Sequence, residues 1–206
     1  MWCANNEEGF FVAIDGPNGV GKSTLIAAIK SKMEAAGYVV YTTKEPTDTE
    51  LGGFIRQFAE NHSGISLACL VSADRYEHIS KEIIPELKNG VLVITDRYIL
   101  SSLILQAIDG VSQTFILNLN SDILKPDLQL AVFANEDVLQ KRLANRNVLT
   151  RFEIGNQSDK ELSYMELGIV ELKKLNVNVL CINNNDNFEA NVDRIVNYII
   201  KNWRKV

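Results

Sequence analysis

The feature that most constrains this chain is a glycine-rich loop that joins a short apolar run to a helical pattern. Residues 10–14 read FFVAI, and residues 16–23 read GPNGVGKS, which fits the pattern GxxxxGK[ST]. A strand before such a loop and a helix after it let backbone N–H groups converge on phosphate oxygens. We therefore expect a nucleoside triphosphate site made by Gly16, Pro17, Asn18, Gly19, Val20, Gly21, Lys22, Ser23 and Thr24.

Two of these loop residues carry specific chemistry. Lys22 is expected to reach the β- and γ-phosphates, and the Ser23 hydroxyl is expected to ligate Mg²⁺. The helix that begins here directs the partial positive charge of its N-terminus at the same anion.

Short apolar runs alternate with helical patterns along the rest of the chain. Strands are expected at 10–14, 38–43, 91–95, 127–133 and 177–182. Helices are expected at 22–36, in segments between 49 and 88, from near 99, at 136–146 and at 188–203. Runs that are apolar throughout suit strands buried on both faces. The pattern predicts an α/β fold: a five-stranded parallel sheet with helices on both faces.

Composition excludes several classes of protein. A net charge of -5 argues against broad binding to nucleic acid or membranes. The three cysteines are far apart and form no CxxC pair, so neither a disulfide framework nor a zinc site is indicated. The first residues lack a basic stretch followed by an apolar one, so we expect a cytoplasmic protein. Residues 145–159 are polar and basic and interrupt the alternation, which suggests a short lid.

The third expected strand ends in Asp96-Arg97-Tyr98, where open α/β sheets bind ligands. Asp96 can hold the water shell of Mg²⁺, and Arg97 can hold a phosphate. A GTP-hydrolysing switch would need a DxxG after its metal strand and an NKxD-type guanine reader, and the chain has neither. A phosphotransferase is therefore the favoured class.

Three segments together resemble the thymidylate kinases in order and spacing: DGPNGVGKST, TKEPTDTELGGFIR, and SADRYEHI followed by VLVITDRYILSSLILQ. The resemblance runs from about Phe10 to Arg151 and is weaker beyond. It implies a single P-loop kinase domain over residues 1–206 that passes the γ-phosphate of ATP to a nucleoside monophosphate, with dTMP the first candidate. It also implies Mg²⁺, a closing lid and a homodimer.

The resemblance assigns roles on the acceptor side. The arginine of the DR pair, Arg97, would grip the acceptor phosphate, and a planar guanidinium suits a phosphate dianion. Arg75 would contact the base. Ser102 and Gln106 would meet the base edge, although either could be an ordinary helix-surface polar residue.

The segment after the second strand adds three acceptor-side residues. Lys44-Glu45-Pro46 stands where many members of the family have Arg-Glu-Pro. Glu45 would lie near metal and phosphate, and Pro46 would lie against the base. Lys44 keeps the charge of the arginine that it replaces but lacks the bidentate fork.

Members of the family differ in where the transition-state arginine comes from. Some carry it in the P-loop, but Gly19 occupies that position here. The resemblance then makes Arg146 and Arg151, in the expected lid, the candidates for that role. A positioned arginine can contribute about 10³ to 10⁵ in rate.

The chain departs from the family at four positions, all assigned to the acceptor pocket. Asn18 replaces a P-loop carboxylate, and Val71 replaces the phenylalanine on which thymine stacks. Leu105 and Ile169 replace aromatic residues. Losing one aromatic platform could cost about 1 to 3 kcal/mol of stacking. We therefore expect relaxed or redirected selectivity.

Three alternatives to a dTMP kinase stay open on the sequence. The first is a kinase of another or a modified nucleoside monophosphate. The second is a nucleoside kinase, which would need a carboxylate base beside the acceptor hydroxyl. The third is an ATP-binding module without turnover.

Overall fold

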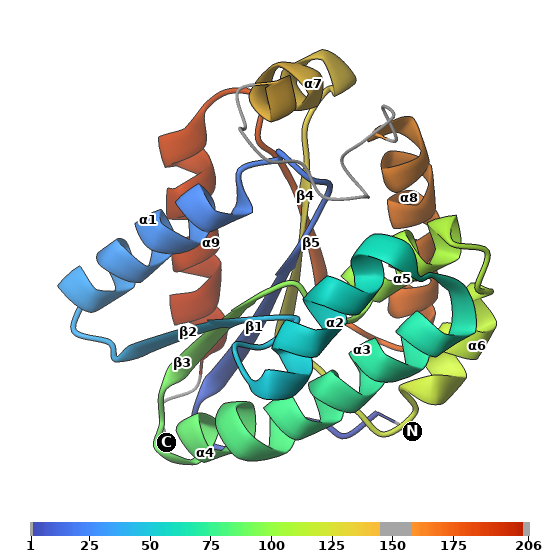
Figure 1. Ribbon diagram of the computed structural model, residues 1–206. Coiled ribbons are helices and arrows are strands. Elements are labelled where there is room, and N and C mark those ends of the chain that lie inside the picture. Colours follow the sequence, from blue (N-terminus) through green and yellow to red (C-terminus); the bar gives the residue numbers. More distant parts are fainter. Residues whose placement is uncertain (1, 145–157, 204–206) are drawn as a thin grey trace.

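A parallel five-stranded sheet forms the centre of the protein (Figure 1). The computed structural model describes residues 2–144 and 158–203. The strand order is β2-β3-β1-β4-β5. The strands are β1 (Phe10–Asp15), β2 (Val40–Lys44), β3 (Leu92–Asp96), β4 (Leu128–Phe133) and β5 (Val179–Asn183). Each lies within two residues of its expected range, and the predicted α/β fold is confirmed.

Alternate residues of the strands feed two separate cores. Along β1, Phe10, Val12 and Ile14 belong to one apolar cluster, and Phe11 and Ala13 belong to the other. This is the period of two that a pleated strand imposes on its side chains. Both sets are buried, which explains why the strands read as continuous apolar runs.

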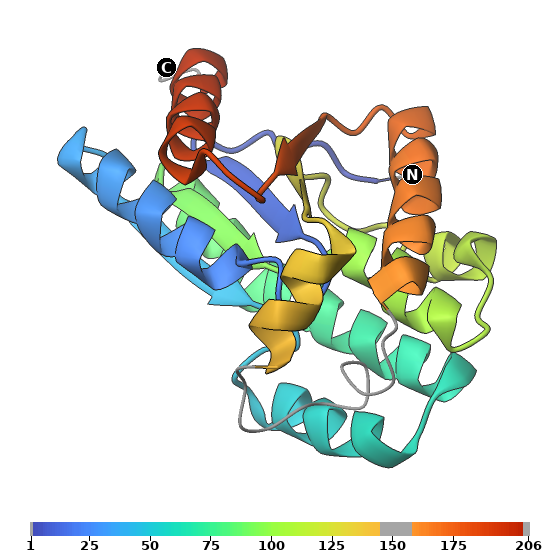
Figure 2. The ribbon, with the colours of Figure 1, turned by 90° about the horizontal axis from the view of Figure 1, so that it is seen from above.

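Helices cover both faces of the sheet, as Figure 1 and Figure 2 show. One face packs against α1 (Lys22–Ala35) and α9 (Phe188–Asn202). The other packs against α3 (Gly64–His78), α5 (Ile99–Ile108) and α8 (Ser158–Lys174). The remaining described helices are α2 (Glu50–Asn61), η1 (Ile79–Ile83), α4 (Ile84–Lys88), α6 (Gln113–Leu119) and α7 (Glu136–Ala144).

Two helical features differ from the sequence expectations. Helix α6 was not expected, although Ser112 caps it by accepting a hydrogen bond from the Phe115 N–H at 3.2 Å. Helix α8 begins at Ser158, so the last two residues of the expected lid at 145–159 are helical. The rest of that segment lies outside the described residues.

Three helices are followed by a residue with a positive φ angle, as helix ends commonly require: Gly37 after α1, Gly90 after α4 and Asn176 after α8. None of the described helices is both long enough and apolar enough to cross a bilayer.

The start of α2 approaches the preceding loop so closely that one position has no room for a side chain. A Cβ at Gly52 would lie 2.0 Å from the Thr47 carbonyl oxygen. Thr47 is held in turn by Asp74 of α3, which accepts from its backbone N–H at 2.9 Å and from its hydroxyl at 2.6 Å. The adjacent Gly53 has open space where its Cβ would be.

These adjacent glycines give a matched test of the packing. We expect Gly52→Ala to lower the free energy of unfolding by about 1 to 3 kcal/mol, because backbone would have to move. Gly53→Ala should be neutral or stabilising by up to about 1 kcal/mol, because alanine favours the helix. Urea unfolding followed by circular dichroism measures both. Equal effects of the two substitutions would contradict the close contact.

Candidate active site

The P-loop holds a buried cation. Lys22 is the first residue of α1 and is 8% exposed. Its Nζ donates to the carbonyl oxygens of Gly16 at 3.0 Å and Pro17 at 3.1 Å. Burial, and to a smaller extent the nearby Arg97 guanidinium, lower the pKa of Lys22 to about 7. The loop therefore presents an ammonium group that a bound anion would stabilise.

Beside this lysine, a hydroxyl and a carboxylate lie together. The Ser23 hydroxyl donates to Asp96 Oδ2 at 3.2 Å. The other carboxylate oxygen, Oδ1, is buried and has no hydrogen-bond partner among the described residues. The Ser23 hydroxyl and the Asp96 carboxylate, one oxygen of which accepts no hydrogen bond, suit Mg²⁺. This ion typically takes one or two protein ligands and completes its shell with phosphate and water.

The register of the sheet brings the expected phosphate-side residues to one edge. Ile14 of β1 and Lys44 of β2 both lie opposite Asp96 of β3. A cavity of about 300 Å³ opens at this edge. Its lining consists of Asn18, Gly19, Gly21, Lys22, Ser23, Thr24, Lys44, Glu45, Asp96 and Arg97. Lys44, expected on the acceptor side, is thus placed on the phosphate side.

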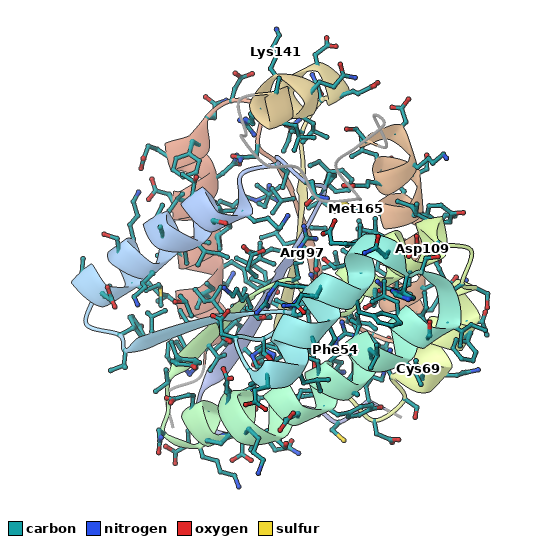
Figure 3. All side chains as sticks on the ribbon, viewed as in Figure 1. Phe54, Cys69, Arg97, Asp109, Lys141 and Met165 are labelled. Carbon is teal, nitrogen blue, oxygen red and sulfur yellow. The ribbon has the colours of Figure 1, made fainter. Side chains whose placement is uncertain are left out.

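The turn after β3 aims Arg97 inward, and Figure 3 shows it near the middle of the molecule. Arg97 has a φ of 76°, unusual for a residue with a side chain. Its backbone N–H donates to the Ile14 carbonyl at 2.9 Å. Its guanidinium donates to Ser101 Oγ at 3.1 Å and to Asn18 Oδ1 at 2.6 Å. These contacts hold the guanidinium beside the P-loop.

A second cavity, of about 390 Å³, lies on the other side of Arg97. It brings together nearly all the expected acceptor-side residues: Asn18, Glu45, Pro46, Val71, Arg75, Arg97, Ser102, Leu105 and Gln106. Ile169 does not line it; this residue is 6% exposed and packs in the core on that face of the sheet. The expectation that Ile169 reshapes the acceptor pocket is therefore wrong.

Arg75 is 1% exposed and lies in a buried polar network. Its guanidinium donates to Glu45 Oε2 at 2.9 Å, Asn120 Oδ1 at 2.8 Å and Ser102 Oγ at 2.9 Å. The second Glu45 oxygen lies 3.2 Å from Nδ1 of His78. Glu45, expected near metal and phosphate, does line the phosphate-side cavity, and both its oxygens are engaged here by Arg75 and His78.

Several polar residues of the site, Arg56 of the second cavity among them, were missed by the sequence reasoning. Asp15, Ser101 and Glu161 are buried, and Asn184 hydrogen bonds to the P-loop. The only sequence signal was Asp15, a charge at the end of an otherwise apolar run that leads into the loop. The others lie in helices or after β5, where spacing alone does not mark them.

Helix α7 and the residue that follows β5 also contact the P-loop, at the Val20 carbonyl. Arg142 of α7 donates to the carbonyl oxygens of Val20 at 3.0 Å and Asn184 at 3.1 Å. The Asn184 side-chain amide donates to the same Val20 carbonyl at 2.8 Å. Arg142 lies just before the expected lid at 145–159. The lid arginines Arg146 and Arg151 lie outside the described residues.

The two cavities meet at a shared wall of Asn18, Glu45 and Arg97. The smaller cavity contains Lys22 and the oxygens of Ser23 and Asp96, which suit a triphosphate with its metal ion. The larger cavity is bounded by Arg97, which suits an acceptor phosphate. Fold and site together define a P-loop nucleotide kinase.

Comparison with known proteins identifies the family. The sequence matches the thymidylate kinase family over residues 14–195, and the chain belongs to that family. A probable thymidylate kinase of Caldivirga maquilingensis is 41% identical over 147 residues, covering 69% of this chain and 72% of its relative. A thymidylate kinase of Caldicellulosiruptor saccharolyticus is 39% identical, covering 66% and 70%. A probable thymidylate kinase of Pyrococcus horikoshii is 34% identical, covering 80% and 84%.

The lowered pKa of Lys22 predicts that nucleotide binding takes up a proton. A bound triphosphate stabilises the ammonium form, so the pKa of Lys22 rises on binding. Uptake is expected on the order of one proton at pH 8 and little at pH 6, and affinity should fall as the pH rises above about 7. Calorimetry at pH 8 with magnesium and a triphosphate, in buffers of different ionisation enthalpy, measures the uptake.

Lys22→Arg is the matched control, because a guanidinium stays charged in both states. It should show no proton uptake at pH 8. Equal binding heats for the unaltered protein in both buffers would contradict the prediction.

Proposed function

We propose that this protein transfers the γ-phosphoryl group of ATP to dTMP, giving ADP and dTDP, and that it uses Mg²⁺. The observation that carries the proposal is the shared wall of Asn18, Glu45 and Arg97 between the two cavities. A triphosphate in one cavity and a monophosphate in the other would meet at that wall. The thymidylate kinase names of the relatives support the choice of acceptor.

The residues of the chain then have separate tasks. Lys22 binds the β- and γ-phosphates, with its ammonium form stabilised by them. Ser23 and Asp96 would hold Mg²⁺, which when bound neutralises phosphate charge. Arg97 holds the acceptor phosphate in line with the γ-phosphorus. Arg146 and Arg151 remain the candidates for the arginine that stabilises the transferring group.

The transfer needs no general base from the protein. The second pKa of a phosphate monoester is about 6, so the acceptor phosphate is largely a dianion at neutral pH. One of its oxygens bonds to the γ-phosphorus while the bond from that phosphorus to the β–γ bridging oxygen breaks, and ADP leaves with the electron pair. This balance explains why the acceptor phosphate needs an arginine to hold it and no carboxylate to take a proton from it.

Polar atoms of the second cavity suit a pyrimidine of the thymine or uracil type. Gln106 Oε1 is buried and has no partner among the described residues, so it can accept from the ring N3–H. The Ser102 hydroxyl accepts from Arg75 and has its own proton to donate to a ring carbonyl. The neighbouring walls include Val71 and Leu105, which are aliphatic.

These contacts bear on the alternatives. A nucleoside kinase is disfavoured because Glu45 is engaged by Arg75 and His78 and because Arg97 lies where an acceptor phosphate would sit. A kinase of another monophosphate is kept open by the aliphatic walls. A binding module without turnover is disfavoured by two cavities that share one wall.

A coupled ADP-release assay with dTMP, dUMP, dCMP, dAMP, dGMP and thymidine tests the proposal. We expect the highest kcat/KM with dTMP, but an advantage over dUMP smaller than the 1 to 3 kcal/mol that one methyl group is worth in a tight pocket. Lys22→Ala gives the background rate. If no monophosphate increases the rate of ADP release, the proposal is wrong. If a purine monophosphate gives the highest kcat/KM, dTMP is not the preferred acceptor.

Arg97→Ala should separate the two substrates. Loss of a charged hydrogen-bonding partner should weaken dTMP binding by about 1.5 to 3 kcal/mol. Binding of ATP at pH 8 should be unchanged or tighter, because removing the Arg97 charge raises the pKa of Lys22. Titration calorimetry with each ligand measures the two effects. Equal losses for dTMP and ATP would show that Arg97 has another role.

A further inference from the structure

A carboxylate from α8 reaches the P-loop. Glu161, near the start of that helix, is 3% exposed. Its Oε2 accepts from the backbone N–H of Asn18 at 2.9 Å, and its Oε1 accepts from the Asn18 side-chain amide at 3.2 Å. Both oxygens of one buried carboxylate thus bind the same P-loop residue. Such a charge is costly to bury without partners, so the contact has to be maintained.

This contact orients the Asn18 amide. Because Nδ2 donates to Glu161, Oδ1 faces the other way and accepts from Arg97 Nη2 at 2.6 Å. An amide has a donor end and an acceptor end, and each end here has a partner of the opposite kind. An aspartate at 18 could accept from Arg97 but could not donate to Glu161. Glu161 and Asn18 therefore match as a pair.

The inward face of α8 supports the same arrangement. Met165, one turn beyond Glu161, is fully buried and packs in the apolar core on the α8 side of the sheet. Further along, Gly168 lets α8 lie against α5: a Cβ there would be 2.8 Å from Leu100 Cδ1. Helix α5 carries Ser101, the second partner of Arg97. Helix α5 thus contacts the guanidinium directly through Ser101, and α8 reaches it through Asn18.

We propose that Glu161 is a positioning residue that sets Arg97 for the acceptor phosphate through Asn18. The inference rests on the proposed monophosphate kinase activity and adds a specificity-determining pair to it. The pair acts on the acceptor, because the Asn18 atom that depends on Glu161 contacts the acceptor arginine.

Exchanging the two functional groups tests the pair. Asn18→Asp sets two carboxylates against each other, and Glu161→Gln sets two amide donors against each other or turns the Asn18 amide round. Each single variant should raise the KM for dTMP by about tenfold or more. The KM for ATP should change less. The double variant restores a donor facing an acceptor at each contact, so its KM for dTMP should lie within about threefold of the unaltered protein.

Glu166→Gln is the matched control, because Glu166 is an exposed glutamate on the same helix. It should leave both KM values unchanged. The inference is overturned if Glu161→Gln behaves like Glu166→Gln, or if the effects of the single variants multiply in the double variant. Should a single variant fail to fold, as judged by its thermal melting curve, the double variant must still fold and bind dTMP, and its failure would also overturn the inference.

The two proposals fail in different ways. If the unaltered protein phosphorylates no monophosphate, the proposed function is wrong. If it phosphorylates dTMP but the two positions show no coupling, only the role of Glu161 is wrong. If another monophosphate proves to be the better acceptor, the unaltered protein, the two single variants and the double variant are compared with that substrate.

Discussion

One buried carboxylate organises the site. Asp15 ends β1, is fully buried, and accepts from the backbone N–H groups of Tyr98 at 2.9 Å and Ser101 at 3.0 Å. It also accepts from the Ser101 hydroxyl at 2.5 Å and from Gln129 Nε2 of β4 at 2.9 Å. Because an unpaired buried charge costs several kcal/mol, these partners stay together. The P-loop follows Asp15 directly and Arg97 precedes Tyr98, so the phosphate loop and the acceptor arginine share one anchor.

Much of this arrangement could be predicted from local sequence. The strands are recognisable because burial on both faces demands continuous apolar runs, and the phosphate loop because its glycines occur at a fixed spacing. The residues at the end of β3 were predicted to lie at the site because open α/β sheets bind ligands at the carboxyl ends of their strands, and those at the end of β2 were predicted by resemblance. Lys44 and Asp96 do lie at that edge, in register. The lid arginines Arg146 and Arg151 remain predictions.

The parts that could not be predicted are contacts between distant side chains. Glu161 and Asn18 are 143 residues apart, and no periodicity or spacing connects them. Ile169 was assigned to the acceptor pocket by resemblance, but the rotation of α8 turns it into the core. Glu45 was placed near metal and phosphate by resemblance, which did not reveal that the buried Arg75 takes one of its oxygens as a counter-charge. The partners of these side chains are set by tertiary packing, which local sequence does not show.

The wall of Asn18, Glu45 and Arg97 also makes the two binding events thermodynamically linked. A ligand that moves any of these side chains in one cavity changes the lining of the other. By reciprocity, whatever factor the first ligand applies to the affinity for the second, the second applies to the first. Synergy or antagonism between the substrates is therefore a property of one small set of side chains, and the order in which the substrates bind cannot alter its size.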